Sequence, residues 1–480
     1  MRLNLLKTSG NALAILSSDV MNRATSFVLY ALVARHLGAH EFGELMVALT
    51  LFYTLQVFSV GGLKTLIIRQ VAKDRSQTAS YFLNGCAIVT VSSICSVFAL
   101  IAVVLVLHYP PETSRVILLL SFGLIPYAFS AVCEGIFQAW ECMRYIPYVN
   151  VPVNIVKVAA AFILLSQRRG LYAVVLIVLT SLIAIALIEV CIMLRRFPAR
   201  HATFDPSFAW GVARSATTFL GIDGIISVMT GLNVILLSKL ATETEVGLYS
   251  AATQVMVPLL LVYQSIAQSI FPAMCQRFQT GIHNLKRIAE NAIELLLVLA
   301  APAVAGIYFF GDWALSVLYK NPVFSQAFPA LRIVSWTLIL QVFTSVLGQV
   351  LLASHREKIT LRIVALDTLI NLCVGWPLIS WFGLQGAAIA LLLTRAADCL
   401  QHYVPVSRLL SGLPLARIVW KPAVAALFMI TCLLLPSTRF RFLTGISATF
   451  VYAGTLLLLS VWVSGGPRQF KQKYLVLLSE

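Results

Sequence analysis

The chain has 480 residues, of which 59% are hydrophobic and only 11% are charged, whereas soluble proteins carry about 25% charged residues. This composition excludes a soluble enzyme or binding module and indicates a protein that crosses a membrane many times. The apolar stretches are long and unbroken, which favours helical spans over the short alternating strands of a membrane barrel. The net charge of +16 lies mostly in short loops, where the positive-inside rule explains it, so no nucleic acid partner is expected.

Six apolar spans are predicted in the first half of the chain. They cover approximately residues 12–37, 42–68, 81–107, 116–140, 145–166 and 171–194. Only four residues separate the first two spans, so we expect these spans to form an antiparallel hairpin. Lys64 belongs to the basic link that follows the hairpin. The basic segment 195–201 is the predicted boundary between the two halves.

Eight spans are predicted after this boundary. They cover approximately residues 210–240, 246–274, 288–310, 328–354, 359–382, 384–407, 419–436 and 442–464. The last two have no counterpart in the first half. The predicted domains are therefore a six-helix lobe over residues 1–200, a second six-helix lobe over residues 201–411, and two extra helices with a basic tail over residues 412–480.

The second half repeats the first. A shift of 204 residues aligns acidic, basic and glycine positions of like character: Asp19 with Asp223, Arg35 with Lys239, Glu41 with Glu245, Gly43 with Gly247, and Lys73 with Arg277. A shift of 213 residues aligns Gly170–Leu171 with Gly383–Leu384. Because six spans return the chain to its starting side, the lobes have the same orientation and a pseudo-two-fold axis along the membrane normal. Such duplications point to a site between the copies.

Loop charge and cysteine placement give two further predictions. With the N-terminus inside, the inner loops hold most of the Lys and Arg residues, so both termini are placed in the cytoplasm. The first span has no small-residue cleavage site and is interpreted as a retained span. The nine cysteines lie almost all in apolar runs without a CxxC pair or a His cluster, and are interpreted as packing residues rather than disulfides or metal ligands.

Signatures of catalysis are missing from the sequence. It has no Walker loop, no GxSxG elbow, no HExxH and no paired DxD motif. We therefore predict that the chain is not an enzyme and holds no cofactor or metal.

Ionisable residues inside apolar spans are the remaining candidates, because a charge at bilayer depth is costly and usually faces a cavity. Asp19 and Arg23 are four residues apart and can pair on one helix face, either to orient the helix or to line a cavity. Lys157 has no acid within one turn and should face water or an anion. Asp223 repeats Asp19 but has Ser227 where the basic partner would be. It is either a protonatable site or a packing residue.

The second half adds one more pair. Arg395 and Asp398 are three residues apart in the twelfth span and are predicted to share a helix face. Glu134, Glu189 and Asp367 are lone acids in their spans and are assigned structural roles.

Three sequence segments resemble a known family. Residues 34–38 (ARHLG), followed by Phe42–Gly43, resemble the end of the first hairpin in polysaccharide-export flippases. Residues 246–252 (VGLYSAA), followed by 270–272 (IFP), resemble its second-half counterpart, and residues 347–353 (LGQVLLA) resemble the tenth-span pattern. The family belongs to the multidrug/oligosaccharidyl-lipid/polysaccharide exporter superfamily.

This resemblance implies a fold and a function. The expected fold is all-α and polytopic, with about 14 transmembrane helices in two six-helix lobes around a central cavity, plus two C-terminal helices. The expected activity is flipping of undecaprenyl-diphosphate-linked oligosaccharide across the bacterial inner membrane, with membrane lipids and polysaccharide polymerase or chain-length proteins as partners. Cationic cavity residues would hold the diphosphate, and Arg23 matches such a position.

The resulting hypothesis is alternating-access transport for O-antigen, capsule or exopolysaccharide assembly. Arg23, Lys157 and Arg395 would attract the diphosphate, while Asp19, Asp223 or Asp398 would pair with them or carry a coupling proton. These six residues, three basic and three acidic, form the predicted substrate-binding site. Two alternatives stay open: a cation-coupled drug antiporter of the same superfamily, and a membrane polysaccharide polymerase or ligase, although the chain lacks the large outer loop typical of the latter.

Overall fold

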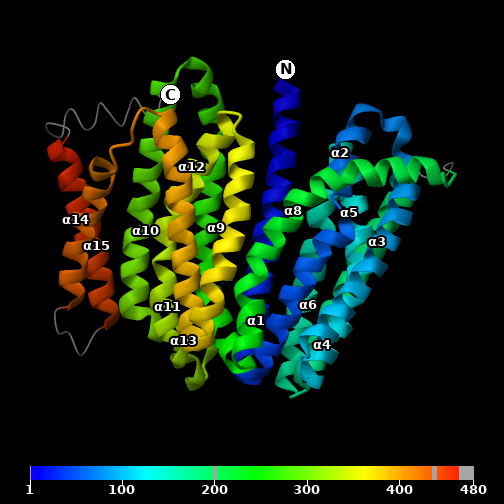
Figure 1. Cartoon of the computed structure of the whole chain (residues 1–480), viewed down its shortest axis with the longest axis horizontal. Coiled ribbons are helices and arrows are strands. Elements are labelled where there is room, and N and C mark those ends of the chain that lie inside the picture. Colours follow the sequence, from blue (N-terminus) through cyan, green and yellow to red (C-terminus); the bar gives the residue numbers. More distant parts are fainter. Residues whose placement is uncertain (1, 198–202, 435–440, 464–480) are drawn as a thin grey trace. The chain divides into compact units, whose positions relative to one another are not determined.

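The computed structural model describes residues 2–197, 203–434 and 441–463 (Figure 1). Within these ranges every regular element is a helix and none is a strand, which confirms the predicted all-α class. The predicted boundary segment 195–201 falls partly outside the described residues, and the predicted basic tail after residue 463 falls wholly outside them.

The helices follow one another with short links. In the first part of the chain they are α1 (Arg2–Val60), α2 (Leu63–Lys73), α3 (Thr78–Leu107), α4 (Pro111–Ser121), α5 (Leu124–Ala139), α6 (Tyr145–Ser166), α7 (Gly170–Arg196) and α8 (Pro206–Leu240). Then come α9 (Glu243–Thr280), α10 (Ile282–Tyr319), α11 (Phe328–Ser335), α12 (Thr337–Ala353), α13 (Glu357–Leu409), α14 (Leu415–Leu434) and α15 (Arg441–Val463). Single 3-10 turns, η1 (Arg75–Gln77) and η2 (Pro322–Ala327), complete the series.

Twelve stretches of the described chain are long and apolar enough to cross a membrane. Two of them, Ser17–Lys73 and Glu357–Leu409, each join two helices at a non-helical glycine. Gly38 has φ 88° and Gly383 has φ 51°, a region that glycine enters at little cost because it has no Cβ. If each of these two stretches crosses twice, the total is consistent with the predicted fourteen spans.

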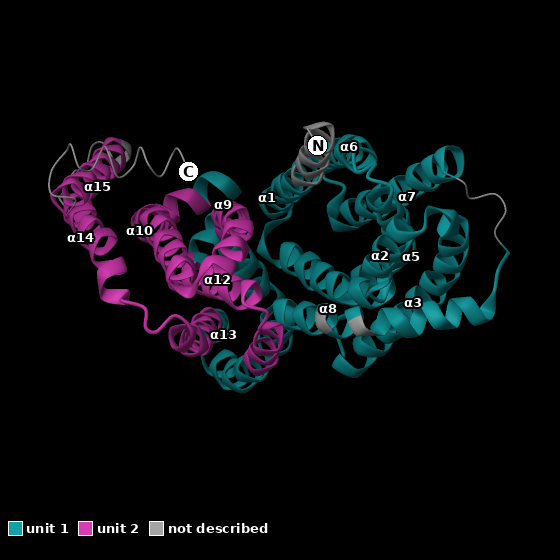
Figure 2. Ribbon diagram, turned by 90° about the horizontal axis from the view of Figure 1, so that it is seen from above, with its two compact units in different colours: residues 1–254, 316–327, 368–387 teal, residues 255–315, 328–367, 388–480 magenta. Residues whose placement is uncertain are grey.

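The chain divides into two compact units, coloured in Figure 2. Unit 1 contains residues 1–254, 316–327 and 368–387, and unit 2 contains residues 255–315, 328–367 and 388–480. In unit 1 a core forms where Leu63 and Ile67 of α2 meet Val132 and Ile136 of α5. In unit 2 small and medium side chains of α10, α14 and α15 form a second core: Ala305, Ala425, Met429, Ala448 and Tyr452.

Apolar side chains also cover much of the outer surface. On α3 the exposed residues include Val91, Phe98, Leu105 and Val106, which are between 64% and 73% exposed. Water would penalise such surface, whereas lipid tails solvate it as well as a protein core does. Together with the length of the apolar helices, this surface identifies a multi-pass membrane protein.

The internal repeat is visible as a reciprocal contact in unit 1. A Cβ atom on Gly43 would overlap the carbonyl oxygen of Glu243, and a Cβ atom on Gly247 would overlap the carbonyl oxygen of Ala39. The sequence shift of 204 residues relates Ala39 to Glu243 as it relates Gly43 to Gly247. Two-fold symmetry produces this kind of exchange, in which each partner offers the same surface to the other.

A second reciprocal contact follows the same rule. Glu41 accepts a hydrogen bond from the backbone N–H of Leu171. Its repeat counterpart, Glu245, accepts one from the backbone N–H of Leu384 at 3.1 Å. The residues that precede these two leucines, Gly170 and Gly383, both have positive φ angles. The duplication read from the sequence therefore extends to the hydrogen bonds that fix the ends of the spans.

Helix α8 is held against α1 and α2 by small residues. Asp205 caps it by accepting hydrogen bonds from the Ser207 hydroxyl and from the N–H groups of Ser207 and Phe208, which hold the pKa of this carboxyl below its usual range. Farther along, Gly224 lies against Phe58 and Gly231 against Thr50 of α1. These contacts bring the middle of α8 beside the second half of α1.

The glycine contact between α1 and α9 gives a first prediction. Replacing Gly43 with alanine should lower stability by about 1–3 kcal/mol, because the added methyl group has no space and the backbones must separate. The melting temperature of the purified protein in detergent measures this effect. The double variant, with Gly43→Ala and Gly247→Ala, should lose less stability than the two single variants added together, because both substitutions disturb the same contact.

Gly211→Ala is the matched control, since no atom lies within 4 Å of a Cβ built at that helical glycine. It should melt like the unmodified protein. Equal melting temperatures for Gly43→Ala and Gly211→Ala would show that the close approach is not needed.

Candidate substrate-binding sites

A polar pocket of about 510 Å³ lies within unit 1. Its walls come from the second half of α1, from α2 and α5, and from α8. Ten of its sixteen lining residues carry polar side chains: Thr50, Tyr53, Thr54, Gln56, Lys64, Thr65, Tyr127, Asp223, Ser227 and Thr230. All ten belong to stretches long and apolar enough to span a membrane. A pocket that offers this many polar side chains at such a depth provides a place for a polar ligand that lipid would reject.

Lys64 is the cation of this pocket, and its charge is matched. Its Nζ lies 2.5 Å from Oε2 of Glu134 on α5, whose other oxygen accepts a hydrogen bond of 3.2 Å from Asn150 on α6. Sequence reasoning assigned Lys64 to a basic link and treated Glu134 as a lone acid. The lone-acid prediction for Glu134 is wrong, because folding brings it beside Lys64, which is 70 positions away.

A further carboxyl lies behind this ion pair. Glu189 of α7 is fully buried and accepts a hydrogen bond from the hydroxyl of Ser130. Its second oxygen, Oε1, has no hydrogen-bond partner among the described residues. Glu134 and Lys64 lie within electrostatic range of it. Four helices, α2, α5, α6 and α7, thus contribute to one polar network that reaches the pocket at Lys64.

Lys157 of α6 is connected to α1 through two amide side chains. Its Nζ lies 2.5 Å from Oδ1 of Asn154, and Nδ2 of Asn154 donates a hydrogen bond of 2.7 Å to Oδ1 of Asn22. Arg23, the next residue of α1, is exposed, and so is Asp19 one turn earlier. This relay fixes the neighbouring turns of α1 and α6 on which the two predicted cations Arg23 and Lys157 lie.

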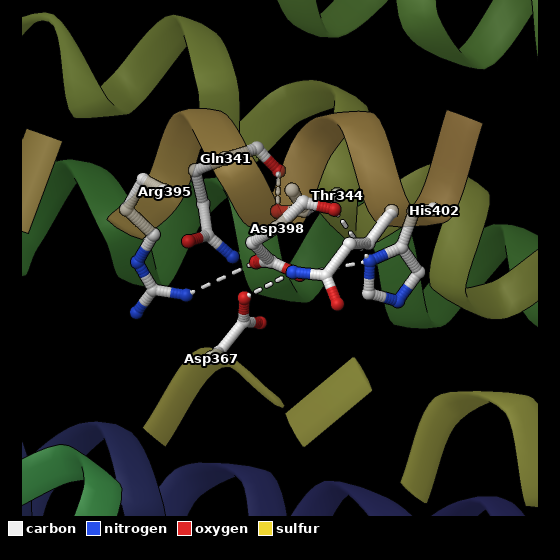
Figure 3. Close-up of polar contacts among 7 residues, drawn as sticks. Gln341, Thr344, Asp367, Arg395, Asp398 and His402 are labelled. Carbon is white, nitrogen blue, oxygen red and sulfur yellow. Dashed lines mark hydrogen bonds and ion pairs between the residues drawn. The ribbon is translucent and has the colours of Figure 1, made fainter. Parts of the chain in front are cut away.

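In unit 2, a buried cluster forms around Asp398 of α13 (Figure 3). Oδ2 of Asp398 is 3.5 Å from Nη1 of Arg395, and Oδ1 is 2.8 Å from Nδ1 of His402. The ion pair predicted from the three-residue spacing is therefore present. His402 follows Asp398 by one helical turn, a spacing that the sequence analysis did not use.

The cluster also joins two distant turns of α13. Asp367 lies within hydrogen-bonding reach of Asp398 and accepts a hydrogen bond of 2.7 Å from Nε2 of Gln401. Figure 3 shows Gln341 and Thr344 of α12 beside these groups. Two adjacent carboxylates repel each other unless a proton or cation lies between them, so this arrangement has the chemistry needed to share, take up and release a proton.

The six predicted site residues therefore fall into three places: Asp19, Arg23 and Lys157 on α1 and α6, Asp223 in the pocket, and Arg395 with Asp398 in the cluster. The cation that shares the pocket with Asp223 is Lys64, which sequence reasoning missed. The sequence pattern also does not predict that Tyr53 and Tyr127 line the pocket. Isolated tyrosines in apolar spans cannot be told from packing residues by their spacing.

Three relatives of this chain are named as flippases or as an O-antigen transporter. A segment of 172 residues is 27% identical to the probable low-salt glycan biosynthesis flippase Agl15 of Haloferax volcanii, covering 36% of each chain. Over 299 residues the chain is 23% identical to the putative O-antigen transporter of Shigella dysenteriae, covering 60% of this chain and 72% of that protein. The match to Agl15 thus spans about a third of that protein's length.

Solved structures share the fold. The lipid II flippase MurJ in its inward closed conformation superposes with a TM-score of 0.78 over 93% of this chain and 98% of that chain, at 14% identity. An inward-facing multidrug resistance MATE family transporter of the MOP superfamily superposes with a TM-score of 0.67 over 82% and 98%, also at 14% identity. These similarities extend over nearly the whole length of both solved structures.

Two protein families match parts of the sequence. MatE matches residues 224–376, which lie in the second repeat. The family of polysaccharide biosynthesis proteins matches residues 9–278, which is more than half of the chain and includes most of α1, the pocket and the α1–α6 relay. The chain therefore belongs to the polysaccharide biosynthesis protein family, which confirms the predicted resemblance to the polysaccharide flippases of the exporter superfamily.

Proposed function

We propose that this protein flips a lipid-linked oligosaccharide across a membrane by alternating access. The observation that carries the proposal is the polar pocket of about 510 Å³ inside membrane-spanning helices, in a chain of the polysaccharide biosynthesis family. A sugar chain is rich in hydroxyl groups, so its transfer into hydrocarbon is prohibitive without polar partners. The names of two relatives, a glycan biosynthesis flippase and an O-antigen transporter, also support it.

The proposed mechanism separates the two parts of the substrate. The polyprenyl tail stays in lipid, while the head group passes through the protein. Arg23, Lys157 and Arg395 attract the diphosphate through charge-assisted hydrogen bonds, which are stronger than neutral ones. Asp19, Asp223 or Asp398 pairs with these cations in the empty state or carries a coupling proton; for Arg395 the ion pair to Asp398 is already formed.

The proposal also includes a biological setting. The carrier lipid is undecaprenyl diphosphate and the membrane is the bacterial inner membrane, in line with the name of the Shigella relative. The product serves O-antigen, capsule or exopolysaccharide assembly, with polymerase and chain-length proteins as downstream partners. Both termini lie in the cytoplasm, as the bias of Lys and Arg among the loops indicates.

The diphosphate site gives a second prediction. Flipping of a fluorescent undecaprenyl-diphosphate oligosaccharide in proteoliposomes should fall at least tenfold in Arg23→Ala with Lys157→Ala. Each hydrogen bond between charged groups contributes about 1.5–3 kcal/mol, and about 1.4 kcal/mol is a factor of ten. Arg169→Ala, at an exposed cation that precedes α7, is the control and should flip at the normal rate.

Normal flipping by the double variant would remove the proposed diphosphate site. A reduced rate in Arg169→Ala as well would show that general surface charge, rather than these two positions, drives the reaction.

The cluster in unit 2 gives a third prediction. An imposed proton gradient should accelerate flipping by the unmodified protein, and Asp398→Asn should abolish the acceleration while flipping without a gradient persists. The reason is that asparagine cannot exchange a proton with Asp367 or His402. Glu357→Gln changes an exposed acid at the start of the same helix and should keep the acceleration. An unchanged response of Asp398→Asn to the gradient would exclude this cluster as the coupling site.

A drug antiporter is the second candidate function, because MatE matches residues 224–376. Efflux of a cationic dye from cells that overproduce the protein tests it. We expect no efflux above the level of cells with an empty vector, because Asp398 of the cluster is paired with both Arg395 and His402 and so has less charge to offer a cationic dye. Dye efflux without oligosaccharide flipping would favour the antiporter.

A further inference from the structure

We propose that the unit 1 pocket is a carbohydrate subsite, which holds uncharged sugar residues of the cargo apart from its diphosphate. Asp223 and Gln56 would hydrogen-bond the sugar hydroxyls, and Tyr53 would offer an aromatic surface. This proposal rests on the proposed function, since it assigns the head group of the same substrate to named residues. The subsite proposal goes beyond that function because it assigns sugar recognition and phosphate recognition to different residues.

The electrostatics of the pocket favour a neutral ligand. The charge of Lys64 is matched by Glu134 at 2.5 Å. Asp223 also lines the pocket, and no ion pair to it occurs within the described part of the chain. The walls therefore present one matched cation and one unmatched carboxylate. A diphosphate would be repelled here, whereas a polyol can donate hydrogen bonds to the carboxylate.

The hydroxyl groups of the walls are arranged as acceptors. Thr54 donates its proton to the carbonyl oxygen of Thr50, and Thr230 donates to the carbonyl oxygen of Ile226, both at 2.8 Å. Their oxygen lone pairs stay available for a ligand. The hydroxyl groups of a sugar can donate to these oxygens and to Asp223, which gives the pocket several acceptors for one ligand.

Donors and an aromatic face complete the site. Gln56 and Tyr127 have no hydrogen-bond partner in the ranges that the structure describes, although both line the pocket, so each has a donor available. Tyr53 is 44% exposed, and its hydroxyl is held 3.0 Å from the hydroxyl of Tyr30. An amphipathic ring fixed at its polar end suits the apolar C–H face of a sugar ring. The volume is within the range of small-ligand pockets.

The fourth prediction tests the subsite with the full-length protein in lipid nanodiscs. The probes are free di- and trisaccharides of hexose, 6-deoxyhexose and N-acetylhexosamine, which carry neither lipid nor phosphate, and inorganic pyrophosphate. Saturation-transfer NMR measures saccharide binding, and titration calorimetry measures pyrophosphate binding. Asp223→Asn and Tyr53→Ala should each weaken saccharide binding about tenfold and leave pyrophosphate binding unchanged.

Controls separate local effects from misfolding. Glu112→Gln and Tyr172→Ala change an exposed acid and an exposed tyrosine away from the pocket and should bind both probes normally. Arg23→Ala with Lys157→Ala should show the opposite pattern, with weaker pyrophosphate binding and normal saccharide binding. Unchanged pyrophosphate binding by Asp223→Asn and Tyr53→Ala demonstrates that these variants are folded.

The outcomes distinguish the subsite from the proposed function. If the protein flips lipid-linked oligosaccharide but Asp223→Asn and Tyr53→Ala bind saccharides normally, the subsite proposal is refuted while the proposed transport function is retained. Loss of pyrophosphate binding in these two variants would make the pocket an anion site and also overturn the proposal. If the unmodified protein binds no saccharide, the subsite proposal is also refuted. Saccharide binding that depends on the pocket, without flipping, would support the subsite and refute the transport function.

Discussion

The close approach of α1 and α9 at Gly43 and Gly247 is the contact on which unit 1 depends. Each glycine lies against a carbonyl oxygen of the other helix, so any larger side chain at either position would force the two backbones apart. Lipid supplies no hydrophobic force between helices, and close backbone packing of small residues is one of the few forces available. The contact fixes the second half of α1, which continues into the wall of the pocket.

The same principle positions α8. Gly224 and Gly231 let this helix approach α1 closely, and the polar residues between and beside them then face Tyr53 and Thr54 across the pocket. The pocket is therefore a consequence of where small residues occur along two helices. Its polar lining is tolerated inside a membrane protein because the outer surface of the bundle stays apolar.

Ion pairing divides the ionisable residues of the apolar helices into two groups. Lys421 of α14 is paired with Glu294 of α10 at 2.8 Å, and this pair fastens one of the two additional helices to unit 2. Lys64 is likewise matched by Glu134. Asp223 has no such partner among the described residues, although an unpaired carboxylate at this depth is costly. A cost of this kind is retained where a ligand, a proton or water compensates it.

The sequence alone determined the all-helical membrane class, the duplication and the general positions of the spans, because these follow from long apolar runs and from repeated charges. It also identified the Arg395–Asp398 pair, since neighbours on one helix turn are visible from spacing. Only the tertiary structure joined Lys64 to Glu134 and brought Asp223 beside Tyr53. Those partners lie 70 and 170 residues apart, and helix packing alone decides which distant side chains meet.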